Sequence, residues 1–125
     1  MNIQVLVADG CDETRKNILD TLQQIGVKNV VEAADAAATI SVFTQKAFEL
    51  VLIDWNLATD GDQNVVQEIH NLNQDVPIVV TTTANEKETI VGQAKDAGAT
   101  DFLIKPFTDV TLQNIIDTHV GAHSA

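Results

Sequence analysis

The sequence predicts a single-domain, doubly wound α/β fold, with a five-stranded parallel sheet covered by helices on both faces. Five short apolar segments alternate with segments of helical spacing along 125 residues, the length of one ordinary domain. Three of the apolar segments consist almost entirely of Val, Ile and Leu, which is typical of strands buried on both faces. Strands that alternate with helices favour a parallel sheet with right-handed crossovers.

The five apolar segments are the predicted strands. They are Ile3–Ala8, Val27–Ala33, Leu50–Ile53, Pro77–Thr81 and Thr100–Ile104. The second segment, VKNVVEA, alternates polar and apolar residues more than the others do. We therefore expect that strand to lie nearer an edge of the sheet.

Apolar residues recur at helical spacing after each predicted strand. The five apolar stripes are Ile18, Leu19, Leu22 and Ile25; Ile40, Phe43 and Ala47; Val65, Val66, Ile69 and Leu72; Ile90, Val91, Ala94 and Ala97; and Leu112, Ile115, Ile116 and His119. Asp35 and Asp62 are the expected N-caps of the second and third helices. Asn85 and Glu88 match a capping box for the fourth helix, and Gly98 is expected to end it.

The charge balance excludes several classes of function. Only 7 Lys and Arg residues stand against 18 Asp and Glu residues, for a net charge of −11. Such a chain lacks the clustered cations that bind nucleic acid or an anionic membrane. A single Cys excludes a disulfide framework and a multi-Cys zinc site. With neither a signal peptide nor a long apolar run in the sequence, we expect a cytoplasmic protein.

Chemically active side chains follow four of the predicted strands. Asp9 comes after the first strand, Asp54 after the third, Thr81–Thr83 at the end of the fourth, and Lys105 after the fifth. In a doubly wound sheet the functional crevice lies beyond the carboxyl ends of the strands, so these residues should converge. Two carboxylates, a hydroxyl and an ammonium suit a hard cation and a phosphoryl group, with an Asp as nucleophile.

Each of these residues also has a purely structural interpretation. Asp9 and Asp12 are candidate helix N-caps, Asp54 is a strand end, and Lys105-Pro106 is a strand-to-turn signal. The Thr run is ordinary strand composition. The functional interpretation gains weight because the residues fall at four different strand ends of one predicted sheet.

Three segments of this chain resemble the receiver domain of bacterial two-component response regulators, in particular the chemotaxis-regulator class. They are IQVLVADGCDETR, EAADAAATISVFTQKAFELVLIDWN and AGATDFLIKPF, in this order and at the spacing of that family. The resemblance extends from Ile3 to about Val120. It implies a flavodoxin-like (βα)5 fold with strand order 2-1-3-4-5.

The resemblance also implies roles for individual residues. Asp54 resembles the phosphoacceptor, and Lys105 the lysine that contacts the phosphoryl group. Phe102 falls at the position of the switch aromatic. The peptide bond between Lys105 and Pro106 is expected to be cis.

A magnesium site is implied by the same resemblance. Its ligands here would be Asp9, Asp54 and the backbone carbonyl of Asn56. The family normally has two adjacent acids after the first strand, and the second position is Gly10 in this chain. We therefore expect weak Mg²⁺ binding. The loop after the phosphoacceptor differs as well, because its Asp60-Gly61 pair comes one position early.

The position of the switch hydroxyl depends on how this chain is aligned with the family. Counting back from Lys105 places it at Thr83, whereas counting forward from Pro77 places it at Thr82. We favour Thr83, because the following Ala84 and the helix spacing agree with it. Neighbouring strand residues face opposite sides, so only one of the two can reach the site.

The expected function is that of a signal-transduction receiver spanning residues 1–125, with no output domain. A histidine kinase or phosphotransfer protein would phosphorylate Asp54. The face made by the fourth helix, fifth strand and fifth helix would then change its affinity for a downstream protein. We expect a monomer or weak homodimer with no role as a conventional enzyme. The alternative is a pseudo-receiver that binds partners without phosphorylation, for which Gly10 argues. A cofactor-binding enzyme is disfavoured, since no glycine-rich phosphate-binding motif occurs.

Overall fold

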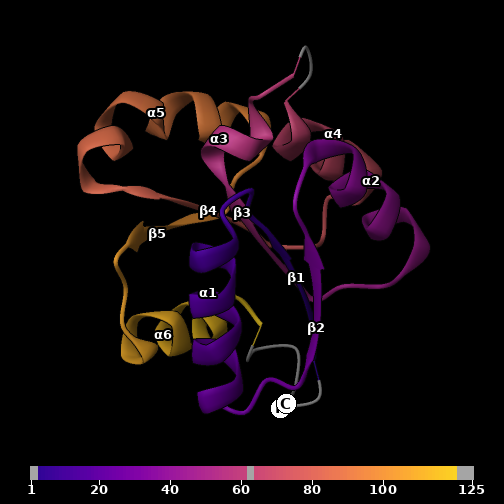
Figure 1. Ribbon diagram of the computed structural model, residues 1–125. Helices are drawn as coiled ribbons and strands as arrows, with labels where there is room; N and C mark the ends of the chain where they lie inside the picture. The colour runs from indigo at the N-terminus through magenta and orange to yellow at the C-terminus, as the bar shows by residue number, and fades with distance from the viewer. Residues whose placement is uncertain (1–2, 62–63, 121–125) are drawn as a thin grey trace.

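The computed structural model describes residues 3–61 and 64–120 and confirms the predicted fold class. A five-stranded parallel sheet has the order β2-β1-β3-β4-β5, the order that the resemblance implies (Figure 1). Its strands are β1 (Gln4–Ala8), β2 (Asn29–Ala33), β3 (Leu50–Asp54), β4 (Ile78–Thr83) and β5 (Asp101–Lys105). The alternating second strand, β2, lies at an edge, as predicted.

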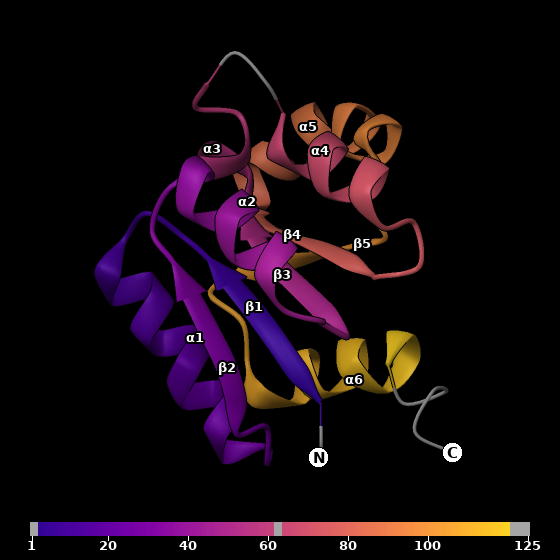
Figure 2. The same ribbon diagram turned by 90° about the vertical axis from the view of Figure 1, so that its right-hand side faces the viewer.

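Helices cover both faces of the sheet (Figures 1 and 2). They are α1 (Asp12–Gln24), α2 (Ala36–Gln45), α3 (Trp55–Ala58), α4 (Val65–Leu72), α5 (Ala84–Ala97) and α6 (Asp109–His119). One core lies between the sheet and helices α1 and α6, and the other lies between the sheet and helices α2, α4 and α5. Within the described part of the chain, no helix is long and apolar enough to cross a membrane.

Strand residues alternate between the two cores, as the two-residue period of a strand requires. In β3, Leu50 and Leu52 belong to the core under α1 and α6, whereas Val51 and Ile53 belong to the opposite core. Asp54, the next residue in the alternation, therefore follows Leu52 to the α1/α6 side of the sheet. This parity decides which strand-end residues can meet.

The observed N-caps of the helices differ in part from the predicted ones. Asp35 caps α2 as expected, because its Oδ1 accepts a hydrogen bond of 2.7 Å from the Ala38 N–H. Asp62 lies outside the described residues, and α4 is capped instead by Asn64, whose Oδ1 accepts a 2.9 Å bond from the Val66 N–H. Cys11 precedes α1 and Asp12 lies in its first turn.

The predicted capping box of α5 is wrong. Strand β4 ends at Thr83 and α5 begins at Ala84, so Asn85 lies inside the helix and not before it. Thr83, the last residue of the strand, takes the N-cap position, and its side chain makes no capping hydrogen bond. The other end of α5 agrees with prediction, since Gly98 ends it with φ of +116°.

Candidate functional site

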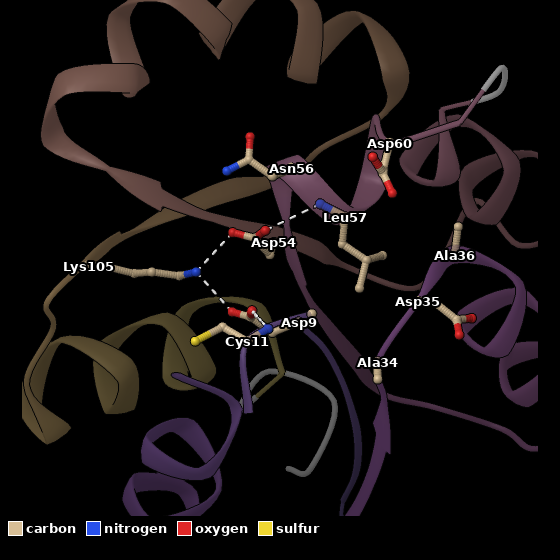
Figure 3. A pocket seen from close by; sticks show the side chains of 11 residues that line it. Asp9, Cys11, Ala34, Asp35, Ala36, Asp54, Asn56, Leu57, Asp60 and Lys105 are labelled. Carbon is tan, nitrogen blue, oxygen red and sulfur yellow. Dashed lines mark hydrogen bonds and ion pairs between the residues drawn. The ribbon is translucent and has the colours of Figure 1, made fainter. Parts of the chain in front are cut away.

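Three charged side chains from three strand ends meet at the carboxyl edge of the sheet. Lys105, the last residue of β5, places its Nζ 2.9 Å from Asp9 Oδ2 and 2.8 Å from Asp54 Oδ1 (Figure 3). Asp9 follows β1, and Asp54 ends β3. All three lie on the α1/α6 side by the alternation of their strands, in step with Val7, Leu52 and Leu103. The structure thus brings together three of the residues that the sequence predicted to converge.

The two carboxylates are also held by backbone donors. Asp9 Oδ1 accepts a 2.9 Å hydrogen bond from the Cys11 N–H, and Asp54 Oδ2 accepts one of 3.2 Å from the Leu57 N–H. The side chains of Asp9 and Asp54 are only 3% and 14% exposed. Such burial is tolerable because both carboxylates share the Lys105 ammonium. The second backbone bond caps α3, a one-turn helix that the sequence analysis did not predict.

The pKa of Lys105 shows which interactions dominate in the cluster. Burial is the largest single influence and lowers this pKa, but the hydrogen bonds to Asp54 and Asp9 and the negative charges of these two residues together raise the pKa above its ordinary value. Lys105 is therefore charged at neutral pH. With two carboxylates and one ammonium, the cluster carries a net charge of −1.

Arg15 fixes the backbone at Asp9. Its NH1 group donates a 2.8 Å hydrogen bond to the Asp9 carbonyl, while its Nε and NH2 groups bind Glu32 at 2.9 Å and Asp12 at 2.6 Å. Helix α1 and the end of β2 are thereby tied to the loop that carries Asp9. This Arg lies in the segment IQVLVADGCDETR, whose pattern alone does not indicate its contact with Asp9.

A cavity of about 450 Å³ opens above the cluster. Its lining residues are Asp9, Gly10, Cys11, Ala34, Asp35, Ala36, Asp54, Asn56, Leu57, Asp60 and Lys105 (Figure 3). Asp60, which the sequence distinguishes only by its shifted position in the loop, follows α3 and lines the cavity, and its N–H donates a 3.4 Å hydrogen bond to the Leu57 carbonyl. Asp35 also lines the cavity, although one of its oxygens already caps α2.

The oxygen donors at this site are of the type that binds Mg²⁺, but the acidic side chains among them are few. Asp9, Asp54 and Asn56 line the same cavity and offer the oxygen ligands that Mg²⁺ prefers. Across residues 3–61 and 64–120, however, no three His, Cys, Asp or Glu side chains gather closely enough to hold a metal ion. Two carboxylates suffice for an ion that keeps several waters, a common arrangement for Mg²⁺.

The three threonines of β4 face different surroundings. Thr83 is exposed and is the register partner of Lys105, so both lie on the same side of the sheet. Thr82 is buried on the opposite side, the side of Phe102, and donates a 3.3 Å hydrogen bond to Glu86 Oε2. The described lining of the cavity includes neither Thr82 nor Thr83, so the choice between them stays a prediction.

The remaining two predicted features lie on or directly after β5. The Lys105–Pro106 peptide bond is cis. Phe102 is half-buried and packs against the core on the α2/α4/α5 side. It lies on β5, three residues before Lys105 and on the opposite face.

Comparisons with known proteins agree with this geometry. The chain is 27% identical over 121 residues to chemotaxis protein CheY-3 of Vibrio cholerae, covering 93% of this chain and 90% of that protein. It is also 27% identical to chemotaxis protein CheY1 of Helicobacter pylori, covering 97% and 99%. Among solved structures, CheY4 of V. cholerae has a TM-score of 0.83 at 26% identity, covering 94% of this chain and 98% of that one.

A longer protein contains the same fold. NtrX of Brucella abortus matches with a TM-score of 0.87 at 25% identity over 99% of this chain, which spans 28% of the NtrX chain. The family model described as response regulator receiver domain matches residues 5–117. That match covers most of the chain and confirms the resemblance found in the sequence, so the protein belongs to the response regulator receiver domain family.

Proposed function

We propose that this protein is a phosphorylatable receiver that accepts a phosphoryl group on Asp54 from a histidine kinase or phosphotransfer protein in the cytoplasm. Receiver domains act as signal switches, not as conventional enzymes, and their family implies histidine kinases and downstream proteins as partners. One observation supports the assignment above all. The Lys105 ammonium lies 2.8 Å from Asp54 Oδ1, at the floor of an open cavity.

The geometry suits nucleophilic attack by Asp54. An Asp54 carboxylate oxygen attacks phosphorus, the bond from phosphorus to the donor's histidine nitrogen breaks, and its electron pair stays on that nitrogen. Lys105 then neutralises charge on the phosphoryl oxygens. The Leu57 N–H, 3.2 Å from Asp54 Oδ2, orients the carboxylate for the attack.

Magnesium is the cofactor that the family typically binds. In this chain we assign its ligands to Asp9, Asp54 and the Asn56 carbonyl, with Gly10 in place of one acid. When bound, the ion would neutralise the negative charge of the carboxylates and of the incoming phosphoryl group. Fewer acidic ligands make that binding weak.

The output of the switch is a change in protein affinity. Phosphorylation adds a charge of about −1.5 to −2 and three acceptor oxygens beside Lys105. We assign the responding hydroxyl to Thr83, with Thr82 as the alternative, and the responding aromatic to Phe102. The face formed by α5, β5 and α6 would then bind a downstream protein, with the chain acting as a monomer or weak homodimer.

A second candidate is a phosphorylation-independent interaction module. Two observations favour it. Gly10 removes one acid from the cluster, and Lys105 already forms ion pairs with both of the carboxylates that remain. In that case the α5–β5–α6 face would bind its partner in one constant form.

Incubation with Mg²⁺ and a small-molecule phosphodonor separates the two candidates. We expect a phosphoryl mass increment in the unmodified protein and none in Asp54→Asn. Asp60→Asn is the matched control, because Asp60 lines the same cavity without contacting Lys105 in the described hydrogen bonds. No increment in the unmodified protein supports the interaction module, and an increment mapped to another acid overturns the assignment of Asp54.

A further inference from the structure

The hydroxyl of Thr81 stands out in the middle of β4. Thr81 is 1% exposed, and its Oγ1 is buried without a hydrogen-bond partner among the residues that the structure describes. A buried hydroxyl without a partner is destabilising, and native proteins rarely contain one without a reason. Thr39 provides the contrast, because its equally buried hydroxyl donates a 2.7 Å bond to the Asp35 carbonyl.

The register of the sheet places Thr81 beside the phosphoacceptor. Thr81 is the direct partner of Asp54 in the β3–β4 pairing. Register partners in a parallel sheet send their side chains to the same face. That face is the α1/α6 side, since Val79, two residues before Thr81, belongs to the core there. Thr81 therefore lies on the face that also carries Asp54 and Lys105.

Asp54 is held by donors other than Thr81 in the present state. Asp54 Oδ1 accepts from the Lys105 ammonium at 2.8 Å, and Oδ2 accepts from the Leu57 N–H at 3.2 Å. A phosphoryl group on Asp54 would bring three further oxygens of high charge. These oxygens would attract the Lys105 ammonium, which would then leave the Asp54 side-chain oxygen that it now holds.

We propose that the Thr81 hydroxyl is a hydrogen-bond donor to the phosphorylated Asp54 side chain and that it stabilises this state over the unphosphorylated one. The inference rests on the proposed phosphorylation of Asp54. A group that is unpaired in one state and paired in the other shifts the equilibrium toward the state in which it is paired. The two possible alignments with the family place the switch hydroxyl at Thr83 or at Thr82. Thr81 is therefore a donor distinct from the switch hydroxyl.

Thr81→Val tests the proposal, since Val keeps the shape of Thr and removes only the hydroxyl. The probe is beryllofluoride, a phosphoryl mimic, titrated at saturating Mg²⁺ and followed by the fluorescence of Trp55. We expect Thr81→Val to bind beryllofluoride about tenfold more weakly, the factor that corresponds to about 1.4 kcal/mol. Thr81→Ser, which keeps a hydroxyl, should bind it as the unmodified protein does.

The thermal stability of the free proteins provides the second measurement. Thr81→Val should melt at the same temperature as the unmodified protein or higher, because it removes a hydroxyl that has no partner in this state. Thr39→Val is the matched control. It should melt lower, because it loses a formed bond, and it should bind beryllofluoride normally.

Three results would overturn the proposal. Unchanged beryllofluoride binding in Thr81→Val refutes the role of Thr81 and leaves the phosphorylation of Asp54 intact. A clear loss of stability in free Thr81→Val shows that the hydroxyl already has a partner in the unphosphorylated state. Failure of the unmodified protein to bind beryllofluoride or to be phosphorylated overturns both the proposed function and this inference.

Discussion

Gly10 is the residue at which this chain departs most clearly from the receiver pattern. A Cβ atom built at Gly10 would meet the Ala34 carbonyl oxygen at 3.5 Å, which is an ordinary van der Waals contact. Its backbone is not in the left-handed region, where only Gly26 and Gly98 lie among the described residues. A side chain therefore fits at this position. Neither backbone conformation nor packing therefore requires glycine at this position.

Gly10→Asp should add a third carboxylate to the pair formed by Asp9 and Asp54 and tighten Mg²⁺ binding. We expect a gain of about tenfold or more, since even outer-shell partners of a metal change its affinity by about 10- to 100-fold. Titration of Mg²⁺ against the fluorescence of Trp55, the neighbour of Asp54, measures the change.

Gly92→Asp is the control for the added negative charge. Gly92 lies on α5, and a Cβ atom there meets no described atom within 4 Å. Its Mg²⁺ affinity should equal that of the unmodified protein. Equal affinity in Gly10→Asp, or binding below about 100 micromolar in the unmodified protein, would show that Gly10 does not weaken the site.

Among the elements, α5 depends on a close contact at its C-terminal end. Gly98 has φ of +116°, and a Cβ atom there would lie 2.5 Å from Cγ of His70 on α4. Backbone conformation and packing thus both require glycine at this position. The contact sets how closely the end of α5 approaches α4.

Gly98→Ala should lower the free energy of unfolding by about 2 kcal/mol or more, because it adds backbone strain to a steric overlap. Gly92→Ala, in the exposed interior of the same helix, is the matched variant. It should raise the free energy of unfolding by about 0.5–1 kcal/mol through helix propensity. Urea denaturation measures both. Equal effects of the two substitutions would contradict the role assigned to the His70 contact.

At the scale of the whole molecule, Lys105 joins three strands through two ion pairs. Its partners are Asp9, 96 residues away in sequence, and Asp54, 51 residues away. The Lys105 side chain is only 20% exposed, so most of it is buried although it lines an open cavity. Loss of this cation would leave two buried carboxylates without a counter-charge in a chain whose net charge is already −11.

Lys105→Met should therefore be less stable at pH 8 by about 1–3 kcal/mol. The pKa of Lys105 is raised in the folded protein, so the stability it contributes is complete below its unfolded pKa of about 10.4. That stability is lost as the pH rises through the higher folded pKa. The difference in free energy of unfolding between the two proteins should thus shrink above about pH 10.5.

Thermal denaturation between pH 8 and pH 11.5 measures this difference. Lys16→Met, at an exposed position on α1, is the control and should show no such convergence with the unmodified protein. A constant difference across this range for Lys105→Met would mean that its effect comes from packing and not from charge.

Sequence patterns with short periods predicted most of the fold. The apolar segments of β1, β3 and β4 indicate buried strands because a strand inside a parallel sheet meets apolar neighbours on both faces. The Asp35 cap and the Gly98 helix end were also predictable, since each depends on the conformation of a few adjacent residues. The Asn85 cap failed because the length of β4 depends on its pairing with β5, which extends to Thr83.

Sequence by itself determined the alternation of strands and helices, the edge position of β2, and the set of polar residues that follow the strands. The tertiary structure decided which of them touch. Asp9 and Lys105 meet although β3 and β4 lie between β1 and β5, because strand parity turns both side chains to one face and the lysine side chain is long enough to reach across. The same parity separates Thr82 from Thr81 and Thr83. Which strand-end residues stand opposite one another depends on the register between distant strands, and no local pattern in the sequence encodes that register.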